Sequence, residues 1–158
     1  MRCEFRRAGR RVIASGPFRI GQPADFDATL ALDRAKFWEF LEATQSKDLD
    51  KLKQHNPADW QAKITGQLDK LIKSKGLLHV LKKGLSVDNA HFHLMYPAPL
   101  ASSAQKVHDN FAANIWSVTR QVHHSTANPN ESVDMVVFLN GLPLGTLELK
   151  NAGTHQRA

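Results

Sequence analysis

An Asn-Gly dipeptide between two apolar runs constrains the fold of this chain more than any other feature. The runs cover residues 133–139 and 144–150, and the dipeptide is Asn140-Gly141. Asn-Gly predicts a tight hairpin turn because both residues tolerate positive φ. Apolar side chains fill most positions of both runs, so both faces of the hairpin are apolar. A hairpin of this kind needs cover on both sides, which predicts an α/β domain.

Three charged residues interrupt this apolar hairpin. Asp134 lies fourteen residues before Glu148, and Lys150 follows Glu148 by two residues. Glu148 and Lys150 share a face because side chains alternate along a strand. If the turn centres on Gly141, Asp134 lies directly opposite Glu148. Pro143 is a poor ladder donor, and a loop longer by one residue would move Asp134 to a diagonal position, but either register clusters the three charged groups.

Two carboxylates beside a lysine suit the chemistry of a metal-dependent nuclease. Mg²⁺ takes oxygen ligands, and Asp134 and Glu148 would supply two of them beside waters and a phosphate oxygen. Lys150 could orient the attacking water or stabilise charge that develops on the phosphate. Without a metal, two close and buried carboxylates would have to share a proton. The alternative is structural: Glu-x-Lys is common at strand ends, and Asp134 could be a solvated residue at a strand start.

The wider sequence resembles a known family. The matching residues are SVTRQV at 117–122, NPN at 128–130, VD at 133–134, NGLP at 140–143 and ELKN at 148–151. They resemble the N-terminal endonuclease region of the type I restriction enzyme R subunit, which is the motor and cleavage subunit. The similarity extends more loosely through 41–45, 80–84 and 92–94 and covers about residues 28 to 152.

The resemblance implies a fold, a site and partners. The fold would be restriction-endonuclease-like, a mixed sheet flanked by helices, with a PD-(D/E)xK nuclease site. Carried over by motif, the catalytic residues are Asp134, Glu148 and Lys150, and the Mg²⁺ ligands are Asp134, Glu148 and the backbone carbonyl of Leu149. The intact parent would be a type I site-specific deoxyribonuclease that hydrolyses DNA phosphodiesters. Its partners would be DNA and the methylation and specificity subunits.

The chain also departs from the family pattern. Family members continue into a Gln-x-x-x-Tyr element, two ATP-driven motor lobes and a helical docking region, whereas this sequence ends eight residues after Lys150. It has no Gly-x-x-x-x-Gly-Lys-Ser/Thr loop, so we expect no ATP site here. We therefore expect an incomplete sheet and a fragment that cuts DNA weakly or not at all when isolated. The alternatives are a non-catalytic remnant that binds DNA or the restriction-modification complex, and a small nucleic-acid-binding protein.

Charge is concentrated near the N-terminus. The net charge is +6; residues 1–24 hold six arginines and one acidic residue, while the rest hold 15 basic and 14 acidic residues. This predicts a basic, disordered arm over residues 1–24 and a partial endonuclease domain over 25–158. The arm could contact phosphates. The single cysteine and the lack of any apolar stretch of membrane-spanning length indicate a cytoplasmic protein with no membrane partner.

The remaining elements follow from apolar periodicity and from Gly and Pro. Helices are expected over 33–44, over a stretch capped by Asn56 and stopped by Gly76, over 77–83, and after Ser102 or Ser103 with Val107 and Phe111 on its apolar side; strands are expected over 92–96 and 116–124. His91 and His93 form either a metal pair or a half-exposed strand face. Arg120 and Gln121 could contact a DNA phosphate, and strand pairing or a salt bridge would explain them equally well.

Overall fold

The computed structural model describes residues 4–7, 10–13, 23, 25–124, 128 and 130–148, with backbone alone for the first two ranges. The chain divides into two compact units, which are described separately. Unit 1 comprises residues 1–36 and 115–158, and unit 2 comprises residues 37–114. The chain passes from one unit to the other after Lys36 and after Asn114, whereas the sequence predicts a boundary near residue 24. The single domain expected over 25–158 stays a prediction.

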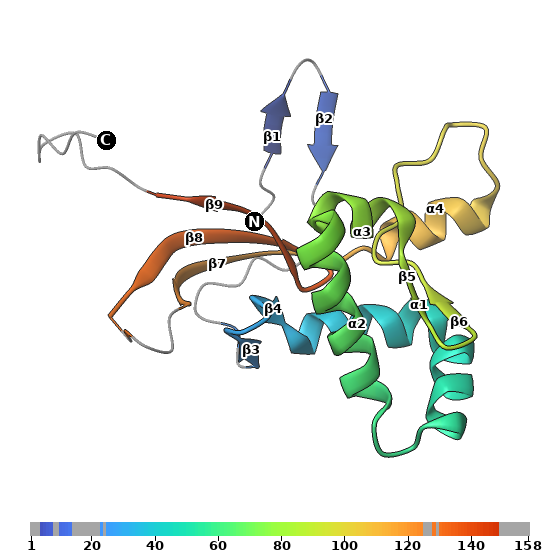
Figure 1. The fold of residues 1–158 in the computed structure, drawn as a ribbon. Coiled ribbons are helices and arrows are strands. Elements are labelled where there is room, and N and C mark those ends of the chain that lie inside the picture. Colours follow the sequence, from blue (N-terminus) through green and yellow to red (C-terminus); the bar gives the residue numbers. More distant parts are fainter. Residues whose placement is uncertain are drawn as a thin grey trace, which may run out of the picture. The chain divides into compact units, whose positions relative to one another are not determined.

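Unit 1 contains a three-stranded antiparallel sheet with β8 in the middle (Figure 1). Its strands are β7 (Trp116–His123), β8 (Ser132–Leu139) and β9 (Leu142–Leu147), in the order β7-β8-β9. The hairpin turn is formed by Asn140 and Gly141, whose φ angles are 51° and 80°. Positive φ at both central residues is the turn geometry that Asn-Gly predicts, and the prediction is confirmed.

The core of unit 1 lies against this sheet. Val122, Val136 and Phe138 form a buried cluster, and Phe26 and Val133 pack against it. The Phe26 and Phe138 rings meet edge to face with centroids 6.3 Å apart. Phe26 belongs to a second, two-stranded ladder of β3 (Phe26–Asp27) and β4 (Leu32–Asp33).

The predicted cover on both faces of the hairpin is wrong for its second strand. Among the described residues of β9, Leu144 and Leu147 are 39% and 47% exposed. Leu142, the first residue of β9, is fully buried, as is Phe138 on β8. Burial is therefore strong near the turn and decreases along β9 toward Glu148.

A short hairpin precedes this sheet in sequence. Strands β1 (Glu4–Arg7) and β2 (Arg10–Ile13) pair antiparallel, with Arg7 opposite Arg10. They lie inside the stretch for which the sequence predicts a disordered arm. Disorder of the arm as a whole stays a prediction.

Unit 2 is mainly helical, with one small hairpin (Figure 1). Its elements are α1 (Arg34–His55, in this unit from Phe37 on), α2 (Trp60–Lys75), α3 (Leu77–Lys83), β5 (Leu85–Val87), β6 (Ala90–Phe92) and α4 (Gln105–Ala112). The fully buried side chains are apolar and come from most of these elements: Phe37, Phe40, Leu41, Leu49, Leu52, Ile64, Leu68, Val80, Leu85, Phe92 and Leu94. The mixed helix-and-strand composition of the two units confirms the α/β class.

A kink divides α1 near its middle. Gln45 has φ −141° and ψ 34°, which is not helical, and the chain then resumes a helix to His55. The predicted helix end at residue 44 therefore coincides with the kink, and the second half was missed. The Gln45 side chain is buried; its Nε2 donates to the His93 carbonyl at 2.9 Å, and its Oε1 accepts from the His93 N–H at 2.6 Å.

Other element boundaries differ from expectation. Helix α2 starts at Trp60, because the Asn56 side chain donates to Asp88 at 3.0 Å and does not cap the helix. Helix α4 follows Ala104, with neither serine as its cap, and its Val107 and Phe111 are exposed. Strand β6 ends at Phe92, although Leu94 continues the buried alternation. Gly76 and Gly84 do end α2 and α3, at φ 82° and 74°.

Candidate functional site

The β8–β9 ladder ends one residue short of Asp134 on one strand and of Glu148 on the other. The ladder begins with Leu139 opposite Leu142, shifts by one residue between Val137 and Phe138, and continues to Met135 opposite Leu147. One further step along each strand leads to Asp134 and Glu148. Carried that one step further, the register would set Asp134 opposite Glu148, as expected for a turn centred on Gly141. The ladder itself ends at Met135 and Leu147, so the opposition of the two carboxylates stays a prediction.

The two carboxylates differ in their surroundings. Asp134 lies within β8 and is half-buried, whereas Glu148 follows the last residue of β9 and is exposed. Asp134 also interacts with other groups of the protein. The exposure of Glu148 leaves its carboxylate open to a ligand from solvent. Leu149 and Lys150 lie outside the described residues, so their roles stay predictions.

On the other side of β8, the ladder is interrupted opposite Asp134. Strand β7 pairs Arg120 with Met135 and Val122 with Val133, and the pair between them, Gln121 and Asp134, is skipped. Gln121 has φ 53°, the left-handed region that a non-glycine residue occupies at a cost of about 1–3 kcal/mol. Regular strand pairing, one of the three interpretations of Gln121, does not hold at this residue, whereas Arg120 does pair with Met135. Left-handed residues cluster at functional sites, and here the strain lies next to the candidate carboxylate.

The donor chemistry of this pair fits a hard divalent cation. Carboxylate oxygens are the ligands that Mg²⁺ prefers, and Mg²⁺ usually retains several waters. Two carboxylates therefore suffice as the side-chain ligands of such an ion. Within the described ranges, no group of three or more His, Cys, Asp and Glu residues could hold a metal ion. Any further ligand here would be water, a backbone oxygen or a phosphate oxygen.

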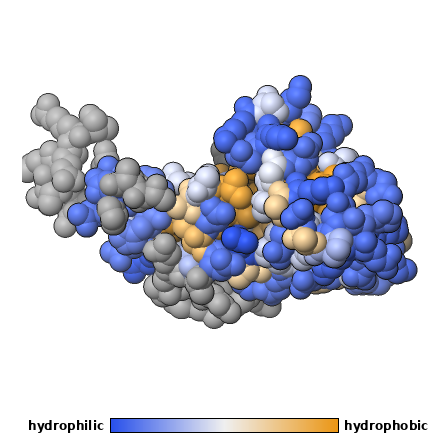
Figure 2. All heavy atoms as spheres, turned by 60° about the horizontal axis from the view of Figure 1, so that its bottom comes forward, coloured by the Kyte–Doolittle hydropathy of each residue, from blue (hydrophilic) through white to orange (hydrophobic). Residues whose placement is uncertain are grey.

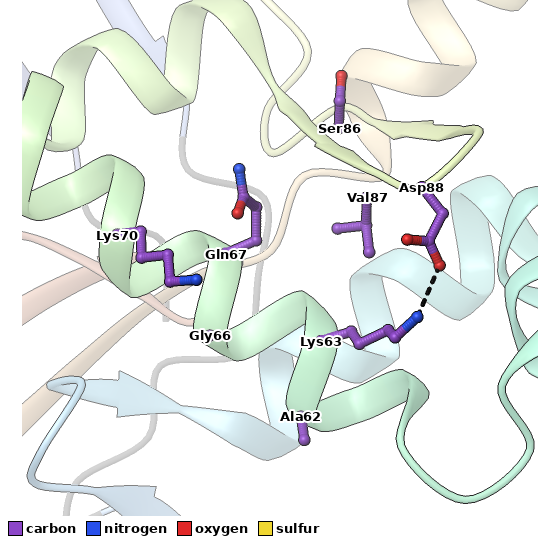
Figure 3. A pocket seen from close by; sticks show the side chains of 8 residues that line it. All are labelled: Ala62, Lys63, Gly66, Gln67, Lys70, Ser86, Val87 and Asp88. Atoms are coloured by element: carbon purple, nitrogen blue, oxygen red, sulfur yellow. Dashed lines mark hydrogen bonds and ion pairs between the residues drawn. The ribbon is translucent and has the colours of Figure 1, made fainter.

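A polar pocket in unit 2 has a structural role (Figure 3). It has a volume of about 410 Å³ and lies between α2 and the β5–β6 turn. Across it, the Lys63 ammonium pairs with the Asp88 carboxylate at 3.0 Å, and Asn56 donates to the same oxygen. The hydrogen bond from Lys63 lowers the pKa of Asp88. Asp88, which has the one carboxylate among the lining residues, therefore links the β5–β6 turn to α2.

The metal-pair interpretation of the two histidines is not supported by their surroundings. The rings of His91 and His93 are exposed and 5.2 Å apart, edge to face. Nδ1 of His91 is hydrogen-bonded to the Ser86 hydroxyl at 2.9 Å. Its Nε2 lies against Gly84, only 2.7 Å from where a Cβ on that glycine would stand. Nδ1 of His91 is thus engaged in a local hydrogen bond, and its ring packs close to Gly84.

The comparison with protein families agrees with the motif. Residues 36–158 match the family described as Type I restriction enzyme R protein N terminus (HSDR_N). The match covers most of the sequence, and the chain belongs to this family. The chain is therefore an N-terminal region of a type I restriction enzyme R subunit, and its family context is DNA and the restriction-modification complex.

The other comparisons found no similar protein. Neither the curated proteins nor the solved structures gave a match. The restriction-endonuclease-like topology consequently stays a prediction beyond the α/β class. Among the helices in the described ranges, none combines the length and the apolar character that a bilayer span requires.

Proposed function

We propose that this chain carries the nuclease site of a type I restriction enzyme R subunit and acts in Mg²⁺-dependent hydrolysis of DNA phosphodiesters. The observation that supports the proposal is the β8–β9 register, which pairs Met135 with Leu147 and, carried one residue further, would set Asp134 opposite Glu148. Family membership adds the restriction context and DNA as the substrate class.

The residues would divide the work as follows. Asp134, Glu148 and the Leu149 carbonyl would hold the cation, which when bound polarises the phosphodiester and activates a water. Lys150 would share a face with Glu148 if strand alternation continued past Glu148, and it would then place its ammonium beside the attacked phosphate. The strained backbone of Gln121 would fix the strand next to Asp134. The open side at Glu148 would admit the DNA backbone.

Metal binding tests this proposal more directly than cleavage, because it requires only the site residues. Mn²⁺ titrated calorimetrically into the purified chain should bind at about one equivalent, as expected for a carboxylate site that holds a hard cation. Asp134→Asn should abolish the binding, because it removes one of the two charged ligands. Glu131→Gln is the matched control, since Glu131 is an exposed carboxylate just before the same strand and accepts a hydrogen bond from Asn128 at 3.0 Å.

A folded chain that binds no Mn²⁺ would contradict the proposal. A non-catalytic role in binding DNA or the restriction-modification complex would then be the better account. Equal loss in the Asp134 and Glu131 variants would also contradict it, because the binding would then reflect general negative charge.

A further inference from the structure

An open pocket of about 540 Å³ in unit 2 is distinct from both sites described above. Three segments line it: the part of α1 around the kink, the stretch from β6 to Tyr96, and helix α4. Two lysines, two histidines, a tyrosine and an asparagine contribute hydrogen-bond donors to its lining: Lys47, Lys106, His91, His93, Tyr96 and Asn110.

The charge of this pocket is positive. Lys47 comes from α1 and Lys106 from α4, and within the described part of the chain neither is paired with a carboxylate. The one acidic residue in the lining, Asp48, is engaged by Lys51 at 2.9 Å. Asp109, on the same helix as Lys106, accepts a hydrogen bond from Gln105 at 2.8 Å. The carboxylates nearby are thus occupied, while the two ammonium groups are available to a ligand.

One wall of the pocket is held in place by two buried amides. The Gln45 amide binds both backbone groups of His93, as described above. The Asn114 amide does the same for Tyr96: Oδ1 accepts from its N–H at 3.1 Å, and Nδ2 donates to its carbonyl at 2.7 Å. The segment that carries both rings has no regular secondary structure, so these bonds fix its backbone.

The rings on this wall also support one another. The His93 ring lies 5.2 Å from that of His91 and 5.5 Å from that of Tyr96, and the Tyr96 ring leans on Phe40 at 5.9 Å. Burial raises the pKa of Tyr96, so its phenol stays protonated and can donate. A wall that is already ordered loses little conformational freedom when a ligand binds.

We propose that this pocket binds a phosphate group, carried either by a DNA backbone or by a free nucleotide. Phosphate presents several acceptor oxygens and negative charge to a pocket that offers N–H and O–H donors and two lysines. The proposal uses none of the residues of the β8–β9 site. Its failure would therefore leave the metal-binding proposal untouched, and the reverse also holds.

The test removes the charges of the two pocket lysines and compares this double variant with one that lacks two lysine charges elsewhere. Lys47→Gln with Lys106→Gln deletes both ammonium groups and leaves a shorter, neutral and polar side chain at each position. Lys82→Gln with Lys83→Gln is the matched control, because these exposed lysines at the end of α3 do not line the pocket. All four side chains are exposed, so both double variants should fold, which circular dichroism checks.

Two probes separate the sources of phosphate. In the first arm, a fluorescent DNA duplex is bound to the full chain over a salt series and followed by anisotropy. Each lost phosphate contact should lower the slope of log K against log salt by about 0.9, and the pocket variant should bind about tenfold more weakly at low salt. In the second arm, AMP and inorganic phosphate are titrated while the Tyr96 ring signal is followed by NMR. Tyr96 is the only tyrosine in the sequence, so selective labelling gives one assignable ring.

Each outcome either supports or overturns the proposed phosphate site. A DNA effect in the pocket variant that the control lacks identifies the pocket as a DNA-phosphate site. A Tyr96 shift with AMP and phosphate that is lost in the pocket variant, with DNA binding unchanged, identifies it as a free-phosphate site. Equal losses in both double variants, or no response in either arm, would overturn the proposal.

Discussion

Two glycines of unit 2 show how much a single residue can decide. Gly84 has φ 74°, and a methyl group on it would lie 2.5 Å from the Phe92 carbonyl oxygen and 2.7 Å from His91 Nε2. Gly66 lies within α2, and a methyl group on it would meet nothing within 4 Å. The first position therefore requires glycine, and the second only tolerates it.

Alanine should act in opposite directions at these two positions. Gly84→Ala combines a disfavoured backbone with close contacts to the β5–β6 hairpin, and we expect a loss of about 2 kcal/mol or more in the free energy of unfolding. Gly66→Ala should raise that free energy by about 0.5–1 kcal/mol, because alanine loses less entropy in a helix. Urea unfolding followed by circular dichroism measures both. A stabilising Gly84→Ala would show that β5–β6 does not pack against this glycine.

At the scale of elements, buried amides replace regular secondary structure where the backbone turns. Gln45, Asn114 and Asn140 are all buried. Asn140 binds Ile115 through its own N–H, which donates to the Ile115 carbonyl at 2.8 Å, and through its Oδ1, which accepts from the Ile115 N–H at 2.7 Å. Each amide satisfies backbone groups of a segment that lies outside helices and strands. Without these bonds, such buried groups would cost about 1–3 kcal/mol each.

The kink of α1 at Gln45 depends on bonds of this kind. Gln45→Ala leaves the His93 N–H and carbonyl without their partner, and we expect a loss of about 2 kcal/mol in the free energy of unfolding. The His93 amide should also exchange its hydrogen faster, since the bond that protects it is gone. Gln67→Ala is the control, because this half-buried glutamine lies in the regular helix α2 and should change stability by less than about 0.5 kcal/mol. Unchanged exchange at His93 would mean that water replaces the amide.

The elements that the sequence predicts well are those fixed by local chemistry. Asn140-Gly141 determines its turn by backbone conformation, and Gly76 and Gly84 end their helices for the same reason. The kink at Gln45 depends on His93, which lies 48 residues away, and no local pattern contains that information. The exposure of Val107 and Phe111 likewise depends on what packs against α4, whereas periodicity shows only that the helix is amphipathic.

The same distinction applies to the candidate site. The β8–β9 register up to Met135 and Leu147 follows from counting residues across the turn, so it could be predicted. The left-handed Gln121 could not, because glutamine has no preference for positive φ. The pocket proposed to bind phosphate could not be predicted either, for another reason. Lys47, His93 and Lys106 come from three distant segments, and only the fold brings them together.

At the scale of the whole molecule, the charge is unevenly distributed along the sequence. Figure 2 shows a face of the described residues on which hydrophilic side chains dominate and apolar patches are small. The net charge of +6 comes mostly from residues 1–24, which contribute six arginines against one acidic residue. Long-range attraction to DNA should therefore depend chiefly on this stretch, while the rest of the chain contributes local contacts.

Neutralising the arginines of residues 1–24 should consequently weaken DNA binding and its dependence on salt. We expect a variant with all six replaced by glutamine to lose about 0.9 in the slope of log K against log salt for each arginine that contacts a phosphate. Mn²⁺ binding at Asp134 should not change, because the variant retains both carboxylates. The loss should add to that of the Lys47 and Lys106 substitutions, since separate contacts contribute independently. A salt slope equal to that of the natural sequence would show that the charge of residues 1–24 takes no part in DNA binding, and the attraction would then arise from the remaining residues.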